Sequence, residues 1–201
     1  MAIDQDVLVV GGGLAGMTAA IAAARTGART RLVSHKQSTL RQASGLIDVL
    51  GYVDGDGPVA DPFEALADLP DNHPYATVGR GAVEAGLALF DGIVGEQYRG
   101  SHTNRNALVP TAAGTVKPTA RYPAATAAGL ANDDRAMLLV GLTELPDFAA
   151  PRAAAHLEST GLPASVRGVT VDFPVEVSAD ATVTRFAHLL DGASADGGPA
   201  G

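Results

Sequence analysis

The sequence predicts an α/β fold built on a parallel sheet. Three observations near the start of the chain indicate it: an apolar run at residues 7–10, a glycine-rich turn, and an alanine-rich stretch at residues 14–26 that leads to a second apolar run at residues 30–33. Strand, turn, helix and strand in this order form one βαβ unit, in which the two strands run parallel. The later part of the chain is predicted to add part of an inserted α+β domain.

The turn carries glycines at positions 11, 13 and 16, the G-x-G-x-x-G spacing of a Rossmann-like fold that binds FAD or NAD(P). The first glycine permits the turn, the second lets a pyrophosphate approach the backbone, and the third lets the helix pack closely on the strand. The free N–H groups and the positive end of the helix dipole then face the anion. A glycine-rich turn without a ligand is the alternative. The expected cofactor contacts are Gly11, Gly12, Gly13, Leu14, Ala15 and Gly16.

The end of the second strand lacks the acidic residue that binds a ribose hydroxyl in NAD-binding folds. The sequence there reads Val33-Ser34-His35-Lys36. Ser34 can still donate or accept one hydrogen bond, so it is an expected cofactor contact. The missing carboxylate disfavours a standard NAD site and leaves room for a flavin that is held differently or lacks its adenosine half. The basic pair His35-Lys36 offers NADP as an alternative, which we rank below a solvated loop.

Composition narrows the class of protein further. The 201 residues carry a net charge of −8 and no tryptophan, which argues against nucleic acid as a partner. The absence of cysteine excludes disulfides and cysteine-held zinc or iron–sulfur clusters in this sequence, and no other metal-ligand spacing occurs. Aspartate is common and lysine occurs only at Lys36 and Lys117, which indicates adaptation to high salt, with codon bias as the alternative. No apolar run is long enough to span a bilayer and no leader is evident, so we expect a cytoplasmic protein.

The elements after the second strand follow from periodicity and turn residues. Residues 37–50 form a polar loop, whose hydroxyl and N–H groups either bind phosphate or flavin oxygens or cap a short helix. Val83, Leu87, Phe90 and Val94 recur at helical spacing and predict a core stripe. The expected elements are a surface loop at 51–62, a short helix at 62–66, a turn at 70–75, a helix at 81–95, a hairpin within 107–123, a strand at 136–140, a helix at 148–160, a strand at 166–173 and a helix at 181–190.

These elements predict three segments. Residues 1–75 form a Rossmann-like flavin-binding segment, residues 76–190 form part of an inserted substrate or interface domain, and residues 191–201 form a flexible tail.

Several short motifs together resemble one family. These are the glycine turn, Gln37-Ser38, Ser44-Gly45 followed by Asp48, Pro58-Val59-Ala60-Asp61, His73-Pro74-Tyr75, Val140-Gly141-Leu142 with Asp147-Phe148, and Arg185-Phe186. In this combination the chain resembles the B subunits of anaerobic glycerol-3-phosphate dehydrogenase, a flavoprotein family akin to the fumarate reductase flavoproteins. Members of that family are much longer, so the resemblance covers an N-terminal portion and leaves a sheet edge to be paired.

The resemblance implies a function and its partners. Family members pair with a larger flavin-bearing dehydrogenase subunit, and the pair docks at the inner face of the cell membrane through an iron–sulfur, membrane-anchoring subunit. The complex oxidises sn-glycerol 3-phosphate to dihydroxyacetone phosphate and passes electrons to quinone, a reaction of glycerol metabolism in anaerobic respiration. The implied cofactor is a flavin, with FMN as the first choice and FAD as the second. By analogy, Ser38, Ser44 and Gly45 lie near the flavin phosphate or ring.

The sequence assigns no catalytic residue. Five histidines could act as a base towards a substrate hydroxyl. His73 lies in a matched motif, but a His-Pro pair is also an ordinary turn. We therefore expect one component of a flavin-dependent oxidoreductase, with two alternatives: a truncated, non-catalytic scaffold protein of the same complex, and another flavoprotein oxidoreductase of the fumarate reductase type.

Overall fold

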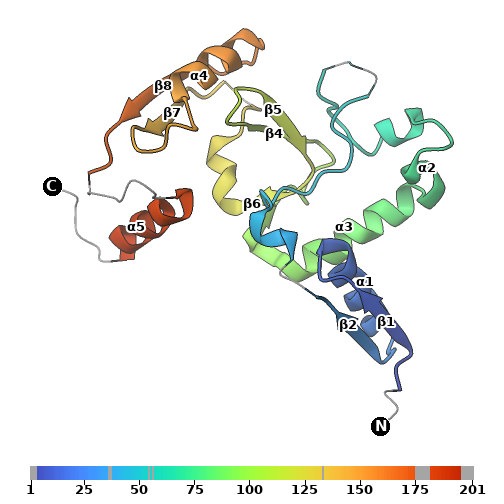
Figure 1. Cartoon of the computed structure of the whole chain (residues 1–201). Helices are drawn as coiled ribbons and strands as arrows, with labels where there is room; N and C mark the ends of the chain where they lie inside the picture. The colour runs from blue at the N-terminus through green and yellow to red at the C-terminus, as the bar shows by residue number, and fades with distance from the viewer. Residues whose placement is uncertain are drawn as a thin grey trace. The chain divides into compact units, whose positions relative to one another are not determined.

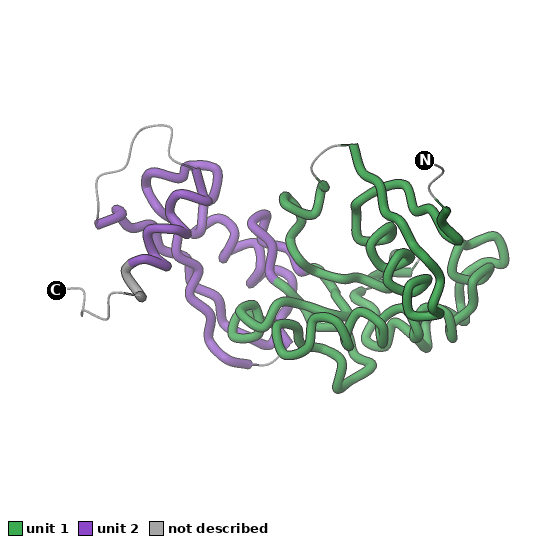
Figure 2. Tube along the Cα trace, turned by 90° about the horizontal axis from the view of Figure 1, so that it is seen from below, with its two compact units in different colours: residues 1–109, 117–130 green, residues 110–116, 131–201 purple. Residues whose placement is uncertain are grey.

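The structure is a computed structural model that describes residues 4–35, 38–53, 55, 57–132, 134–174 and 182–195. Figure 1 labels the elements in chain order. Backbone contacts divide the chain into two compact units: residues 1–109 with 117–130, and residues 110–116 with 131–201 (Figure 2). The predicted boundary near residue 75 concerns the function of the segments rather than their contacts, and it stays a prediction.

The first unit begins with the predicted βαβ arrangement (Figure 1). Strand β1 (Val7–Val10) pairs in parallel with β2 (Thr30–Val33), with Val7 opposite Thr30 and Val10 opposite Val33. Helix α1 (Leu14–Arg25) connects them and packs on both strands. The helix ends at Thr26 and is followed by Gly27 at a positive φ of 87°, a common way for a helix to stop. These predictions of the opening elements are confirmed.

The remainder of the first unit is mostly helical. Its helices are η1 (Thr39–Gln42), η2 (Ala65–Asp68), α2 (Pro74–Val78), α3 (Arg80–Val94), η3 (Gly95–Gln97) and η4 (Ala124–Gly129). The expected turn at 70–75 is wrong at its end, because Pro74 already begins α2. The His73 Nδ1 atom accepts a hydrogen bond from the Tyr75 N–H at 3.1 Å and caps this helix. His73 therefore has a structural role in the turn of its motif.

Short strands complete this unit. Strand β3 (Tyr98–Arg99) pairs antiparallel with β6 (Tyr122–Pro123). Neither two-residue strand was foreseeable from periodicity. The predicted stripe on α3 is core only in part, since Leu87 is buried whereas Val83, Phe90 and Val94 are partly exposed. Phe90 meets Tyr98 edge to face with ring centres 4.9 Å apart, which ties α3 to β3.

A hairpin of β4 (Ala107–Pro110) and β5 (Val116–Thr119) lies where the chain passes between the units, as predicted for residues 107–123. The second unit contains β7 (Met137–Leu142), α4 (Ala150–Ser159) and β8 (Val166–Val171). The two strands pair in parallel, and α4 packs on both of them, most closely on β8. The second unit is thus another βαβ arrangement.

The core of the second unit consists of Ala154, Leu157 and Val166, with Leu157 fully buried. Helix α4 approaches β8 closely because Gly168 has no side chain: an added Cβ would overlap backbone atoms of Ala150 and Pro151. The last helix, α5 (Val183–Ala195), extends five residues beyond the predicted end at 190. The first residues of the expected flexible tail are therefore helical, and residues 196–201 lie outside the described residues.

Among the residues that the structure describes, no element covers one face of either parallel pair. Leu8 is 60% exposed and Val10 is 77% exposed on β1, and Leu138 and Val140 on β7 are 58% and 47% exposed. Parallel sheets are usually covered on both faces. Within the part of the chain that the structure describes, no helix has the length and apolar character needed to cross a membrane.

Candidate functional site

The glycine turn between β1 and α1 has the geometry that its spacing predicts. Gly11 has a φ of 114°, a region that residues with a side chain rarely adopt. Its N–H donates to the carbonyl oxygen of Val33 at 2.9 Å, so Gly11 joins the ends of the two strands. A Cβ on Gly16 would overlap the carbonyl oxygen of Gly11 and lie 3.6 Å from Val9 Cγ1. Only glycine at position 16 lets the helix start so close to the strand.

The N-terminus of α1 has no side-chain cap and leaves room for an anion. Gly13 is the N-cap residue, with φ −79° and ψ −179°, and no side chain caps the helix. The first turn carries no acidic residue, and a Cβ on Gly13 would meet no atom within 4 Å. A helix start normally needs hydrogen-bond acceptors for its first N–H groups. Here the space in front of Gly13 could hold an acceptor, and the helix dipole favours a negatively charged one.

A cavity of about 470 Å³ lies at the carboxyl ends of the two strands. It is lined by Val10, Gly11, Val33, Ser34 and His35. The structure therefore brings two predicted contacts, Gly11 and Ser34, to one cavity. Ligands of open α/β sheets bind outside the carboxyl ends of the strands.

Ser34 also lies directly against the turn. A Cβ on Gly12 would be 2.9 Å from the Ser34 Oγ atom, so the serine fills the space beside the backbone of Gly12. Lys36, a candidate for NADP binding, and Gln37, part of the family motif, lie outside the described residues.

The other predicted contacts follow β2 and organise their own loop. The Ser38 hydroxyl accepts a hydrogen bond from the Leu40 N–H at 3.2 Å and caps η1, so residues 37–50 contain the short capped helix considered as an alternative. The Ser44 hydroxyl accepts from the Leu46 N–H at 3.3 Å. Gly45 has a φ of 79°, and an added Cβ would lie 3.0 Å from Pro123. Each hydroxyl keeps its own hydrogen for donation.

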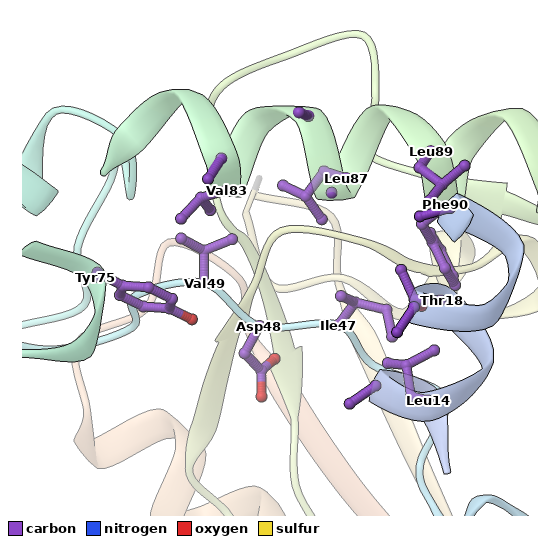
Figure 3. A pocket seen from close by; sticks show the side chains of 16 residues that line it. Leu14, Thr18, Ile47, Asp48, Val49, Tyr75, Val83, Leu87, Leu89 and Phe90 are labelled. Carbon is purple, nitrogen blue, oxygen red and sulfur yellow. The ribbon is translucent and has the colours of Figure 1, made fainter. Parts of the chain in front are cut away.

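A larger cavity, of about 630 Å³, lies between α1, α3 and the segment 47–49 (Figure 3). Its wall is mostly apolar, and Figure 3 shows Val83, Leu87 and Phe90 on α3 facing Leu14 and Thr18 on α1 across it. Its volume is in the range of small-molecule sites. This cavity is not predicted by the spacing of the α3 side chains, because a helical stripe has the same spacing whether it packs in a core or lines a cavity.

Few polar groups reach this cavity. Asp48 and Tyr75 contribute a carboxylate and a hydroxyl to its wall, and the Asp48 carboxylate points away from α3 in Figure 3. The Asp48 carboxylate forms a salt bridge with Lys117 Nζ at 2.8 Å. Asp48 and Lys117 thus offset each other's charge, and the cavity suits a largely apolar ligand.

Charged groups elsewhere in the first unit form surface pairs. The Arg29 guanidinium donates hydrogen bonds to the Asp6 carboxylate and holds the pKa of that carboxyl below its usual value of 3.8. Glu84, one turn along α3, raises the pKa of Arg80 through a 2.8 Å salt bridge. Among the described residues, no group of three or more histidine and acidic side chains could hold a metal ion.

Comparison with known proteins finds close relatives. The chain is 65% identical over 192 residues to the probable B subunit of anaerobic glycerol-3-phosphate dehydrogenase from Halobacterium salinarum, a match that covers 95% of this chain and 45% of that protein. It is 43% identical over 91 residues to the B subunit of anaerobic glycerol-3-phosphate dehydrogenase from Vibrio cholerae, which covers 44% of this chain and 21% of that protein. The chain thus spans less than half the length of these curated relatives. No solved structure matches it significantly.

The relatives confirm the resemblance to the B subunits of this dehydrogenase, and the Halobacterium relative fits the expected adaptation to salt. The family that describes the FAD binding domain matches residues 6–193, nearly the whole chain. This match supports a flavin, but the preference for FMN is not confirmed, because the family is defined by FAD. Together with the βαβ unit and its glycine turn, the match gives the fold as Rossmann-like. The chain therefore belongs to the FAD binding domain family.

Proposed function

We propose that this chain binds FAD at the start of α1 and forms part of a flavin-dependent dehydrogenase that oxidises sn-glycerol 3-phosphate to dihydroxyacetone phosphate. The observation that carries the proposal is the uncapped N-terminus of α1, which faces open space at Gly13 next to a cavity at the strand ends. The names of the relatives support the substrate.

The turn residues would hold the pyrophosphate of FAD. The N–H groups of Gly12, Gly13 and the first helical residues Leu14, Ala15 and Gly16 serve as donors, and Gly13 gives the anion room to approach. Gly11 contributes the bend rather than an N–H group, because its own donates to Val33. The cavity at the strand ends would take the adenosine half, with the Ser34 hydroxyl in place of the usual carboxylate.

The flavin half would extend along the loop that carries Ser38, Ser44 and Gly45 towards the larger cavity. That cavity begins at Leu14 and Ala15, in the first turn of α1, so it adjoins the proposed pyrophosphate position. Its apolar wall suits the aromatic ring system. When bound, the flavin supplies the capacity to accept a hydride from a substrate carbon; the residues of this chain bind and orient it and exclude water.

The assembly and the division of labour along the chain are part of the proposal. Residues 1–75 serve flavin binding and residues 76–190 serve the substrate or an interface. A larger flavin-bearing subunit, together with an iron–sulfur subunit that anchors the complex, completes the enzyme and passes electrons to quinone at the inner face of the membrane. This sequence has no cysteine with which to hold an iron–sulfur cluster, so the cluster must have its ligands elsewhere.

Titration of the purified chain with FAD and with FMN, followed by flavin fluorescence and visible absorbance, tests the cofactor. We expect FAD to bind with the higher affinity and its absorbance bands to bleach with dithionite. A chain that binds neither flavin, yet retains the larger flavin-bearing partner in a pull-down, would support the scaffold alternative instead. Turnover of the assembled complex with glycerol 3-phosphate, compared with succinate, separates the proposed reaction from one of the fumarate reductase type.

Two glycines on α3 give a matched test of where the flavin ring lies. Gly86 lines the larger cavity, whereas Gly92 is exposed on the same helix, and an added Cβ meets no atom within 4 Å at either position. Leucine at either position should favour the helix by about 1 kcal/mol relative to glycine. We expect Gly86→Leu to weaken FAD binding by filling the cavity and Gly92→Leu to leave it unchanged. Equal affinity in both variants would place the ring outside this cavity.

A further inference from the structure

The segment that carries the predicted flavin contacts Ser44 and Gly45 is attached to residues 119–121 through Ile47. We name residues 44–50 the strap. The Ile47 N–H donates to the Arg121 carbonyl oxygen at 2.9 Å, and the N–H groups of Ala120 and Arg121 both donate to the Ile47 carbonyl oxygen at 3.0 Å. The fully buried Thr119 donates its hydroxyl to the same oxygen at 3.1 Å. Ile47 thus anchors the middle of the strap to residues 119–121, alongside the salt bridge of Asp48 with Lys117 and the hydrogen bond that Asn106 Nδ2 donates to the Leu50 carbonyl oxygen at 2.8 Å.

The side chain of Arg121 carries this attachment to α3. Its Nε and Nη2 atoms donate to the two carboxylate oxygens of Asp91 at 2.8 and 2.9 Å, a bidentate pair. Its Nη1 atom donates to the carbonyl oxygens of Gly100 and Ala120 at 3.1 and 2.9 Å. The Arg121 side chain is only 8% exposed. One buried arginine therefore joins α3, the end of β3 and, through its backbone, the strap.

This connection joins two elements that form walls of the larger cavity. The strap forms one wall of the cavity with Ile47, Asp48 and Val49, and α3 forms another with Val83, Leu87 and Phe90 (Figure 3). Neither Asp91 nor Arg121 lines the cavity. The pair nevertheless links the two walls, because the Arg121 side chain binds Asp91 on α3 and the Arg121 backbone binds Ile47 in the strap.

We propose that Asp91 and Arg121 are positioning residues that set the strap, and with it Ser44 and Gly45, for the flavin half of FAD. The inference rests on the proposed function of the chain. A role in stability alone is a poor explanation for the pair, because replacing a buried ion pair by apolar side chains is often neutral or stabilising, whereas the fork of an arginine fixes geometry.

The test uses the full chain and three variants. The double variant Asp91→Leu/Arg121→Met removes the charges together and avoids an unpaired buried charge. Arg121→Lys keeps the charge and loses the bidentate fork. The control, Arg80→Ala/Glu84→Ala, removes an exposed salt bridge from the same helix. The measurements are the urea midpoint, hydrogen exchange of the Ile47 amide, FAD affinity, and the visible absorbance bands of bound FAD.

We expect the double variant and Arg121→Lys to keep a cooperative unfolding transition but to exchange the Ile47 amide faster and bind FAD about tenfold more weakly, as the net loss of about one good hydrogen bond would produce. The bands of bound FAD should shift in both, and the control should match the unmodified chain. Variants that unfold at lower urea yet retain the FAD bands and the Ile47 exchange would overturn the positioning role. If the unmodified chain binds no FAD, the proposed function fails and this inference fails with it. If the unmodified chain binds FAD and the variants bind it with the same affinity and absorbance bands, only this inference fails.

Discussion

Gly13→Ala separates binding from folding at the glycine turn. Its backbone, with φ −79° and ψ −179°, suits any residue, and the added methyl meets no atom within 4 Å. The free energy of unfolding should therefore change by less than about 1 kcal/mol, the cost of a poorer N-cap residue. FAD affinity should fall by about tenfold or more, because the methyl occupies the space through which the pyrophosphate approaches the helix start, and each factor of ten corresponds to about 1.4 kcal/mol.

Gly16→Ala supplies the contrast. Its added methyl would overlap the Gly11 carbonyl oxygen, and overpacking of this kind costs about 1–3 kcal/mol. Urea unfolding followed by circular dichroism measures both variants without ligand, and fluorescence titration measures FAD binding. A Gly13→Ala protein that unfolds like the unmodified chain and binds FAD equally well would refute the assignment of the pyrophosphate to this turn. Loss of stability in Gly13→Ala comparable to that in Gly16→Ala would refute the geometric reasoning itself.

Substitutions at three further positions test the fold. Leu157→Ala should lower the free energy of unfolding by about 2–5 kcal/mol, because Leu157 is fully buried in the second unit; a urea midpoint close to that of the unmodified chain would contradict this core. His73→Ala should cost about 1 kcal/mol by removing the N-cap of α2, and His73→Asn should recover most of it in the same assay. Arg29 lowers the pKa of Asp6, so the stability that the ionised carboxylate adds is present above about pH 4 and is lost as the pH falls through the lowered value. Arg29→Gln should therefore flatten the acid side of a plot of thermal midpoint against pH, and an unchanged profile would count against the pair.

The opening βαβ unit could be predicted from the sequence because its signals are local. Gly11 needs a positive φ, Gly16 needs a close backbone approach, and Gly27 ends the helix at a positive φ. Each glycine therefore meets a steric requirement that arises within the same βαβ unit. The apolar runs on either side then leave one arrangement of strands and helix. Predictions of this kind succeed wherever backbone sterics decide the structure.

The residues that shape the larger cavity could not be predicted in this way. In the sequence, nothing distinguishes Arg121 from an ordinary surface arginine. Its burial depends on Asp91, thirty residues earlier, and on the carbonyl groups that surround it. Val83 and Phe90 have the spacing of a packed stripe, and whether they pack or line a cavity depends on how far the strap lies from α3. Contacts between distant segments carry this information, and a single sequence does not display them.

Position 34 shows how the two kinds of information combine. From the sequence, Ser34 stands where an acidic residue would bind ribose, and its hydroxyl offers a weaker interaction. In the structure, Ser34 lies so close to Gly12 that a Cβ there would meet its Oγ atom at 2.9 Å. The size of the residue at position 34 and the absence of a side chain at position 12 are therefore coupled: a longer carboxylate at position 34 would need to turn away from the glycine turn and into the cavity beside it. The small hydroxyl thus lies within the close approach of the turn to β2, and it also departs from the usual ribose contact.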